Sequence, residues 1–189
     1  MLKIIGGRHR GRSLETPEGS AVRPTAARAR EALFNIVAHA RWRKDGASPL
    51  IAARVLDAFA GSGALGLEAL SRGAAHATFL DNDAASITLI GENVRKLGET
   101  AAAKVVRADV TRPPLAREPC DLVFLDPPYR SGLAAPALAA LATAGWFATD
   151  AIATVELAKS EDLGDARLFE LIDERRYGAA KIVIIRYAS

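Results

Sequence analysis

The sequence has few of the residues that define several common protein classes. A single cysteine, Cys120, excludes an internal disulfide and predicts a reducing compartment such as the cytoplasm. No apolar run approaches the roughly 18–20 residues that a membrane span needs, and no apolar segment follows Lys3 to form a secretory signal. The histidines, His9, His39 and His76, lack the spacing of metal ligands, so no metal site is expected.

Acidic residues are scarce at the amino-terminal end of the chain. Residues 1–54 carry 11 Lys and Arg against 4 Asp and Glu, whereas the remainder carries 14 against 18. Such an asymmetry indicates a surface that binds a polyanion, with a solvated basic face as the simpler alternative. At 189 residues, of which 50% are hydrophobic, the chain predicts one domain with a sizeable core and a small appendage.

Strand-like and helix-like segments alternate from about residue 51 onwards, which indicates repeated βα units. Two more strand-like runs around Tyr177-Gly178 predict a closing hairpin. The pattern predicts an α/β, Rossmann-like fold, with seven strands in a mostly parallel sheet and helices on both faces. The expected strands are residues 54–57, 77–81, 103–107, 121–125, 152–157, 167–174 and 181–187; the expected helices are 25–40, 64–71, 84–97 and 133–144.

Residues 1–20 predict a basic β-hairpin, followed by a single domain over residues 21–189. Strand-like runs at 2–5 and 12–16 flank a turn rich in glycine and arginine. A hairpin of this size is not stable alone, so it must dock on the body of the protein or on a partner. Its charge density favours contact with nucleic-acid phosphates. The expected contacts are Lys3, Arg8, Arg10, Arg12 and Arg23.

A glycine-rich turn follows the strand that ends near Asp57. Gly61, Gly63 and Gly66 have the spacing of a dinucleotide-binding turn, where glycine permits positive φ, a close approach to a ligand and close packing of the helix. Asp81 lies 20 residues beyond Gly61, where an acid that binds ribose hydroxyls is expected. The pattern admits NAD or FAD, S-adenosylmethionine (SAM), or a plain βα turn without a ligand.

The carboxylate of Asp57 favours SAM among these ligands. A pyrophosphate at a helix N-terminus needs positive potential, and a carboxylate would repel it, whereas SAM carries an attracted ammonium and sulfonium. Ligands of open α/β sheets bind at the carboxyl ends of strands, so we expect Asp57 to face the amino-acid end, Asp81 the ribose and Asp109 the adenine amine. A lone acid at a strand end is more often a helix cap, and Asp83 is assigned to that role. The turn residues expected to contact SAM are Phe59, Gly61 and Gly63.

The fourth expected strand of the sheet runs into Asp126-Pro127-Pro128-Tyr129. In isolation this motif predicts a turn. Beside a cofactor site, the prolines would hold the Asp126 carboxylate and the Pro127 carbonyl as rigid acceptors for an exocyclic amine. Accepting both N–H hydrogens would aim the nitrogen lone pair at the sulfonium methyl, with Asp126 taking the proton and Tyr129 stacking on an extruded base. All four residues are therefore candidate catalytic residues.

These segments resemble the bacterial small-subunit rRNA guanine-N2 methyltransferases of the RsmD type, within the class I SAM-dependent methyltransferases. The amino-terminal segments are specific to this family, and the glycine turn and the 126–129 motif are shared across the class. The resemblance covers nearly the whole chain; its segments are residues 4–7, 10–12, 23–25, 30–35, 57–71 and 126–129. Asp81 stands where many relatives carry glutamate.

The resemblance implies methylation of one guanine amine, guanine 966, in the 16S rRNA of the 30S ribosomal subunit. It implies SAM as donor, S-adenosylhomocysteine as product, and no metal or membrane partner. It also implies that Thr25 and its helix contact the methionine end of SAM. We expect the chain to act as a monomer.

Three other functions are consistent with the same residues. A DNA adenine-N6 or cytosine-N4 methyltransferase is the nearest, because the 126–129 motif presents an amine pocket without naming the base. Such enzymes usually carry extra recognition mass, for which this chain has little room. A dinucleotide-dependent oxidoreductase and a non-catalytic RNA-binding assembly factor belong to other classes.

Overall fold

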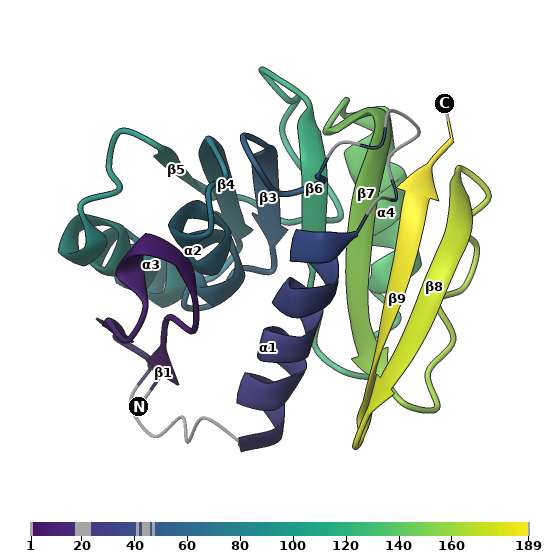
Figure 1. The fold of residues 1–189 in the computed structure, drawn as a ribbon. Coiled ribbons are helices and arrows are strands. Elements are labelled where there is room, and N and C mark those ends of the chain that lie inside the picture. Colours follow the sequence, from purple (N-terminus) through teal and green to yellow (C-terminus); the bar gives the residue numbers. More distant parts are fainter. Residues whose placement is uncertain (1, 18–23, 41, 43–45, 47, 189) are drawn as a thin grey trace.

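The computed structural model describes residues 2–17, 24–40, 42, 46 and 48–188, with the backbone alone for residues 24–28. One large sheet and four α-helices form the body of the molecule (Figure 1). The strands of the sheet are β3 (Arg54–Ala58), β4 (His76–Asp81), β5 (Ala103–Arg107), β6 (Cys120–Leu125), β7 (Phe147–Ala158), β8 (Phe169–Tyr177) and β9 (Ala180–Tyr187). The helices are α1 (Pro24–His39), α2 (Ala64–Ser71), α3 (Ala84–Leu97) and α4 (Ala134–Thr143).

The sheet has the strand order β5-β4-β3-β6-β7-β9-β8. The first five strands in this order are parallel, and β9 is antiparallel to both β7 and β8. From β3 the chain moves outward to β4 and β5, and then returns to β6 on the other side of β3. In open α/β sheets, such a switch in direction marks the ligand site at the carboxyl ends of the strands.

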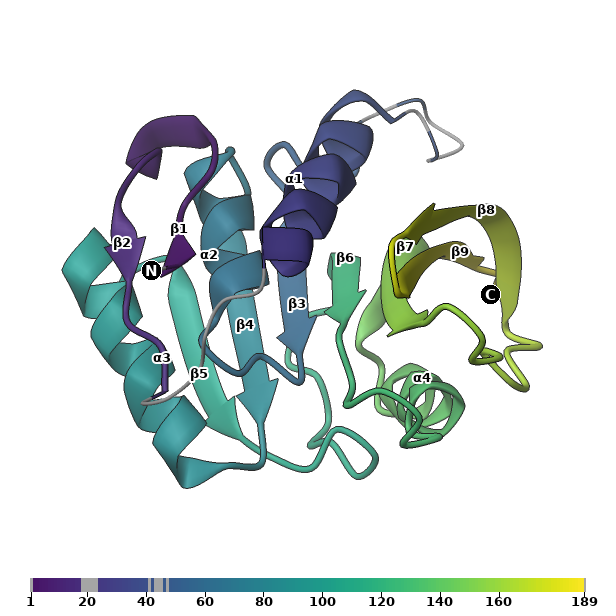
Figure 2. The same ribbon diagram turned by 90° about the horizontal axis from the view of Figure 1, so that it is seen from below.

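Helices cover both faces of the sheet, as the two views show (Figures 1 and 2). On one face, Phe34 of α1, Leu67 of α2 and Ile90 of α3 join Phe79 and Phe124 of the sheet in one core cluster. On the other face, α4 packs into a second cluster. The predicted seven-stranded, mostly parallel sheet with helices on both faces is confirmed. Within the described residues, no helix is both long and apolar enough to cross a membrane.

Two predicted helices and one predicted strand coincide with the observed α2, α3 and β5. The largest difference is β7, which begins at Phe147, five residues before its predicted start. Its early residues pair with β6 across a register shift that follows Cys120, and Asp150 has a positive φ of 58°. A bulge of this kind breaks the hydrophobic alternation that marks a strand in a sequence.

Helix α1 runs across the sheet, and its first turn lies at the edge towards which the β3 and β7 arrows point (Figure 1). The helix begins at Pro24, one residue before its predicted start at Thr25. A proline at the first helical position is common, because its missing N–H would have had no helical partner. The side chain of Thr25 and the whole of Arg23 lie outside the described residues.

The amino-terminal hairpin consists of β1 (Leu2–Lys3) and β2 (Ser13–Leu14), joined through the 3-10 turn Gly7–His9. Both strands are shorter than the predicted runs, although the Ile4 N–H still donates to the Arg12 carbonyl. The predicted boundary at residue 20 falls in residues that are not described.

Glu68 of α2 is fully buried and anchors this hairpin to the body. Its carboxylate accepts hydrogen bonds from the N–H groups of Ile5 and Gly6, both at 2.8 Å. Arg72, one turn along α2, donates its Nε to the same carboxylate at 2.6 Å and lies over the Phe34 ring. A buried charge is tolerated when it is paired and hydrogen-bonded, and here both conditions hold.

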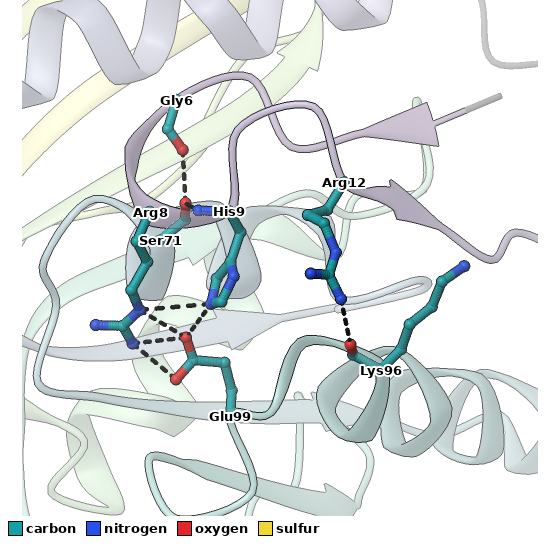
Figure 3. A network of polar contacts seen from close by, with 7 residues as sticks. All are labelled: Gly6, Arg8, His9, Arg12, Ser71, Lys96 and Glu99. Atoms are coloured by element: carbon teal, nitrogen blue, oxygen red, sulfur yellow. Dashed lines mark hydrogen bonds and ion pairs between the residues drawn. The ribbon is translucent and has the colours of Figure 1, made fainter.

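The turn of the hairpin makes a second set of contacts with the body (Figure 3). Ser71 Oγ donates to the Gly6 carbonyl at 2.6 Å and accepts from the His9 N–H at 2.9 Å. Glu99, just beyond α3, accepts from the Arg8 guanidinium at 2.6 Å and contacts His9 Nε2 at 2.5 Å. Through these contacts the hairpin docks on α2 and on the end of α3, and Arg30 of α1 adds a further bond by donating to the Lys3 carbonyl at 2.9 Å.

Close packing of α2 on the sheet depends on Gly66, as predicted. A Cβ at this position would lie 2.3 Å from Cε1 of the fully buried Phe79. We expect Gly66→Ala to lower the free energy of unfolding by about 1–3 kcal/mol, because the core cannot take an added methyl group without strain. Denaturant titration measures this change.

Gly91→Ala in α3 is the matched control. A Cβ at Gly91 would meet no atom within 4 Å, so the same substitution should raise the free energy of unfolding by about 0.5–1 kcal/mol. If the Gly66 variant were as stable as the wild type, α2 would not lie as close to β4 as described.

Candidate functional site

Asp57 lies in β3, and its side chain is 1% exposed. Its Oδ2 accepts a hydrogen bond from the Gly66 N–H, in the first turn of α2, at 2.8 Å. Burial raises the pKa of Asp57 to about 8; the Gly66 bond opposes this shift, and the charges of Asp126 and Asp81 add to it. The carboxyl is therefore largely protonated at neutral pH, and a nearby cation would favour its ionised form.

Asp81, at the end of β4, ties the glycine turn to the sheet. Its Oδ2 accepts from the Gly61 N–H at 2.8 Å, and its Oδ1 accepts from the Asp83 N–H at 2.9 Å. Gly61 and Gly63 have φ values of 54° and 76°, the left-handed conformation that glycine adopts readily and for which the sequence predicts glycine here. The space beside Gly61 is open, with no atom within 4 Å of an added Cβ. Each carboxylate oxygen of Asp81 keeps a lone pair, which suits a ribose diol.

Phe59, between Asp57 and the glycine turn, adopts a left-handed backbone with a φ of 62°. This conformation is strained for a bulky side chain, and such strain concentrates at ligand sites. The ring is partly buried and packs against the core cluster that contains α4. Phe59 therefore directs the chain sharply from the buried strand into the turn.

Asp83 and Asp109 close local turns. Asp83 accepts from the Ser86 N–H at 2.9 Å and caps α3, as predicted. Asp109, beyond β5, accepts from the Thr111 hydroxyl at 2.7 Å and from its N–H at 2.8 Å, and these bonds lower the pKa of Asp109. Only Oδ1 of Asp109 is used by these two bonds, and the side chain is exposed.

The motif Asp126-Pro127-Pro128-Tyr129 follows β6 directly. Asp126 is exposed at the surface, yet protein atoms surround most of the carboxyl, and its N–H donates to the Ala58 carbonyl at 3.4 Å. This burial, followed by the charge of Glu156, raises the pKa of Asp126 to about 7. Pro127 is buried, and Pro128 and Tyr129 are exposed.

Glu156 of β7 is the residue that the sequence motifs do not identify. Tyr129 donates its hydroxyl to Glu156 Oε1 at 2.5 Å. Leu125 of β6 pairs with Val155 of β7, so the residues that follow them, Asp126 and Glu156, lie side by side. The only signal in the sequence is one acid within the apolar run 151–158.

The expected nucleic-acid contacts of the hairpin have two different settings. Arg8 and Arg12 hold the hairpin to the body, Arg8 through Glu99 and Arg12 by donating to the Lys96 carbonyl at 2.9 Å. Lys3 and Arg10 are exposed, and neither pairs with an acidic side chain in the described part of the chain.

The carboxyl groups at the ends of β3, β4 and β6 form one acidic edge. Asp81 and Asp126 are close enough for their charges to act on Asp57. A hollow of about 370 Å³, lined by Leu138 and Phe169, lies away from this edge, beside α4. No cluster of three His, Cys, Asp or Glu side chains suited to a metal occurs among the described residues. The acidic edge has the charge and the open glycine turn that a cationic nucleoside ligand such as SAM requires.

Known proteins show the same sequence pattern over most of this chain. The family model described as "Conserved hypothetical protein 95" matches residues 2–186. Ribosomal RNA small subunit methyltransferase D of Escherichia coli (strain K12) is 42% identical over 157 residues, which cover 82% of this chain and 74% of that protein. The protein of the same name from Haemophilus influenzae is 35% identical over 182 residues, 94% of this chain and 89% of its own length.

Solved structures show the same fold. A putative methyltransferase from Escherichia coli has a TM-score of 0.82 at 35% identity, over 100% of this chain and 98% of its own. A putative RNA methyltransferase from Pyrococcus horikoshii shares the fold alone, with a TM-score of 0.67 at 16% identity over 93% of this chain and 91% of its own. From the extent of the family match and the identity to these relatives, the chain belongs to the RsmD-type family of small-subunit rRNA methyltransferases, built on the class I methyltransferase fold.

Proposed function

We propose that this chain transfers a methyl group from SAM to the exocyclic N2 amine of a guanine in 16S rRNA, guanine 966 of the 30S subunit. The acidic edge at the switch point carries the proposal, because a cationic donor favours the ionised form of Asp57, and that ionised form would repel a pyrophosphate. The relatives are named as small-subunit rRNA methyltransferases, which supports rRNA as the substrate. The enzyme works as a cytoplasmic monomer without a metal.

SAM supplies a methyl group on a positively charged sulfur. Asp57 serves the ammonium, Asp81 the ribose hydroxyls and Asp109 the adenine amine. For Asp109 the support is its exposed side chain, whose Oδ2 takes no part in the turn bonds. The full set of proposed SAM contacts is Thr25, Asp57, Phe59, Gly61, Gly63, Asp81 and Asp109.

Asp126 and the Pro127 carbonyl accept the two N–H hydrogens of the target amine. Holding the amine in line with the methyl group is worth about 7–11 kcal/mol of the barrier. Asp126 then takes the proton that the amine loses, a role for which a pKa of about 7 is well matched. Pro128 fixes the backbone of the motif, and Tyr129 stacks on the extruded base.

Residues 1–20 form the RNA-contacting appendage of a methyltransferase domain over residues 21–189. Its docking on α2 and α3 keeps the exposed cations on a fixed surface beside the catalytic body. The proposed phosphate contacts are Lys3, Arg8, Arg10, Arg12 and Arg23.

Asp126→Asn should lower the rate of methyl transfer by at least about 100-fold, because the amide cannot take the proton. SAM affinity, measured by calorimetry, should stay within a few-fold of the wild type. Transfer is measured on undermethylated small subunits, with nucleoside mass spectrometry to identify the product. Asp165→Asn, on an exposed loop, is the control.

Two results would contradict this assignment. A large loss of SAM binding in the Asp126 variant would place this residue in the cofactor site. A product methylated on adenine or cytosine would reject guanine N2 as the target and favour a methyltransferase for another base.

Asp57→Asn should stabilise the free protein in a pH-dependent way. The folded pKa of about 8 exceeds the unfolded value of about 3.9, so stability falls as pH rises between these values and the unfolded chain releases the proton. An amide has no such titration, so the gain should be near zero at pH 4 and reach at least about 1 kcal/mol at pH 8. Denaturant titrations across this range test it.

The same variant should bind SAM more weakly, since the charge that faces the ammonium is lost. Wild-type binding should release protons near pH 7, which calorimetry in buffers of different ionisation enthalpy detects. If the variant were less stable at every pH, or bound SAM as the wild type does, Asp57 would have only a structural role.

Lys3→Glu with Arg10→Glu should weaken RNA binding and flatten its salt dependence, because each lost phosphate contact lowers the slope by about 0.7–0.9. These two cations are chosen because they do not hold the hairpin to the body. Arg167→Glu, on the exposed loop before β8, is the control for a charge reversal away from the hairpin. An unchanged salt slope would show that the hairpin does not contact phosphates.

A further inference from the structure

Glu156 lies beside the proposed amine site but has no role in the function proposed above. It belongs to β7, where it pairs with Ile182 of the antiparallel β9 and is partly buried. The pairing of Leu125 with Val155 puts Glu156 beside Asp126 at the end of the next strand. Two neighbouring strands therefore present one carboxylate each at the place where the target amine is expected.

The side-chain direction also favours a shared site. Along β6 and β7, Phe124 and Ile152 belong to the core cluster beneath α1, whereas Leu125 and Val155 belong to the cluster with α4. Side chains alternate between the faces of a strand, so the residue after Leu125 and the residue after Val155 both face the α1 side. The carboxylates of Asp126 and Glu156 thus lie on the same face.

Tyr129, three residues after Asp126, is bonded to the second of these carboxylates. Its hydroxyl donates to Glu156 Oε1, which fixes the ring expected to stack on the base. A carboxylate has about four acceptor positions, so Glu156 can hold Tyr129 and accept a further N–H. In the described part of the chain, no Lys or Arg side chain forms an ion pair with Asp126 or Glu156.

Two neighbouring carboxylates that, among the described side chains, have no Lys or Arg partner form an acceptor pair that suits a ligand rich in donors. The three candidate amines differ in their ring neighbours. Guanine carries an N1–H donor next to its N2 amine, whereas adenine has the acceptor N1 beside N6, and cytosine has the acceptor N3 beside N4. A second carboxylate beside the amine site bonds the guanine N1–H and repels the lone pair that the other two bases present.

We propose that Glu156 accepts the N1–H of the target base and so makes the site specific for guanine, with Tyr129 held in place by the same carboxylate. The inference rests on the proposed methyl transfer to an exocyclic amine and adds a residue that selects the base. Glu156 takes part in recognition and moves no proton in the reaction. The like charge of Glu156 also raises the pKa of Asp126, consistent with two acceptors that share one donor-rich edge.

The test uses the full-length protein and reconstituted small-subunit particles that carry guanine or 2-aminopurine at the target nucleotide. 2-Aminopurine keeps the amine but has an acceptor N1. Wild-type protein should methylate guanine at least about 10-fold faster, since the Glu156 acceptor faces another acceptor in 2-aminopurine. In Glu156→Gln, whose amide can donate to N1, this guanine preference should fall by at least about 10-fold or reverse.

Three controls isolate the effect. Glu170→Gln, on β8, should leave the guanine preference unchanged. SAM affinity should match the wild type in Glu156→Gln and in Glu170→Gln. Tyr129→Phe should slow both substrates alike, because it removes the hydroxyl that donates to Glu156 and leaves the N1–H contact in place.

Equal rates of the wild type on the two bases, or an equal preference in wild type and Glu156→Gln, would overturn the role of Glu156. If the wild type methylates guanine N2 but Glu156→Gln keeps the same guanine preference, only the role of Glu156 is rejected and the proposed methyl transfer stands. If the wild type forms no N2-methylguanine, the proposed function fails and the inference fails with it. Mass spectrometry of the nucleosides separates the two cases.

Discussion

The hydrogen bond between the buried Asp57 carboxyl and the Gly66 N–H is the constraint on which the site depends. It joins β3 to the first turn of α2, and the turn between them has to curve tightly to allow it. Phe59 and Gly61 take left-handed conformations on the way, and Asp81 holds the same turn from β4. The ends of three neighbouring parallel strands meet at this turn, and the charges of Asp126 and Asp81 add to the effect of burial in raising the pKa of Asp57. The free-energy cost of ionising the buried Asp57 carboxyl therefore lies at the edge where a cation is proposed to bind.

Carboxylates also hold the amino-terminal hairpin in place, and there they pair with groups of the hairpin. Glu68 accepts hydrogen bonds from backbone N–H groups of the hairpin, and Glu99 neutralises the charge of Arg8. Part of the basic excess of the amino-terminal segment is therefore consumed in docking, and part remains exposed on Lys3 and Arg10. A charge count gives the total but does not separate the two parts, since the acids that pair with the hairpin lie more than 60 residues away.

Much of the fold follows from local pattern. The spacing of apolar residues and the cap Asp83 predict α3 to the residue, and the seven strands were all expected. The start of β7 was not, because a bulge breaks its alternation. At the site, the motif residues are visible in the sequence, but the left-handed backbone of Phe59 and the placement of Glu156 beside Asp126 depend on strand register. Register between distant strands is a tertiary property that no single segment encodes.

The docking of the hairpin imposes an order of assembly. Ile5 and Gly6 bond to Glu68, and Arg8 bonds to Glu99, so the hairpin acquires these partners only after between 62 and 91 further residues have been added. At about 5–20 residues per second, the basic segment stays undocked for several seconds during translation. The βα unit of β3 and α2 has to form before the hairpin can close upon it. The basic hairpin therefore closes on a βα unit that has already formed.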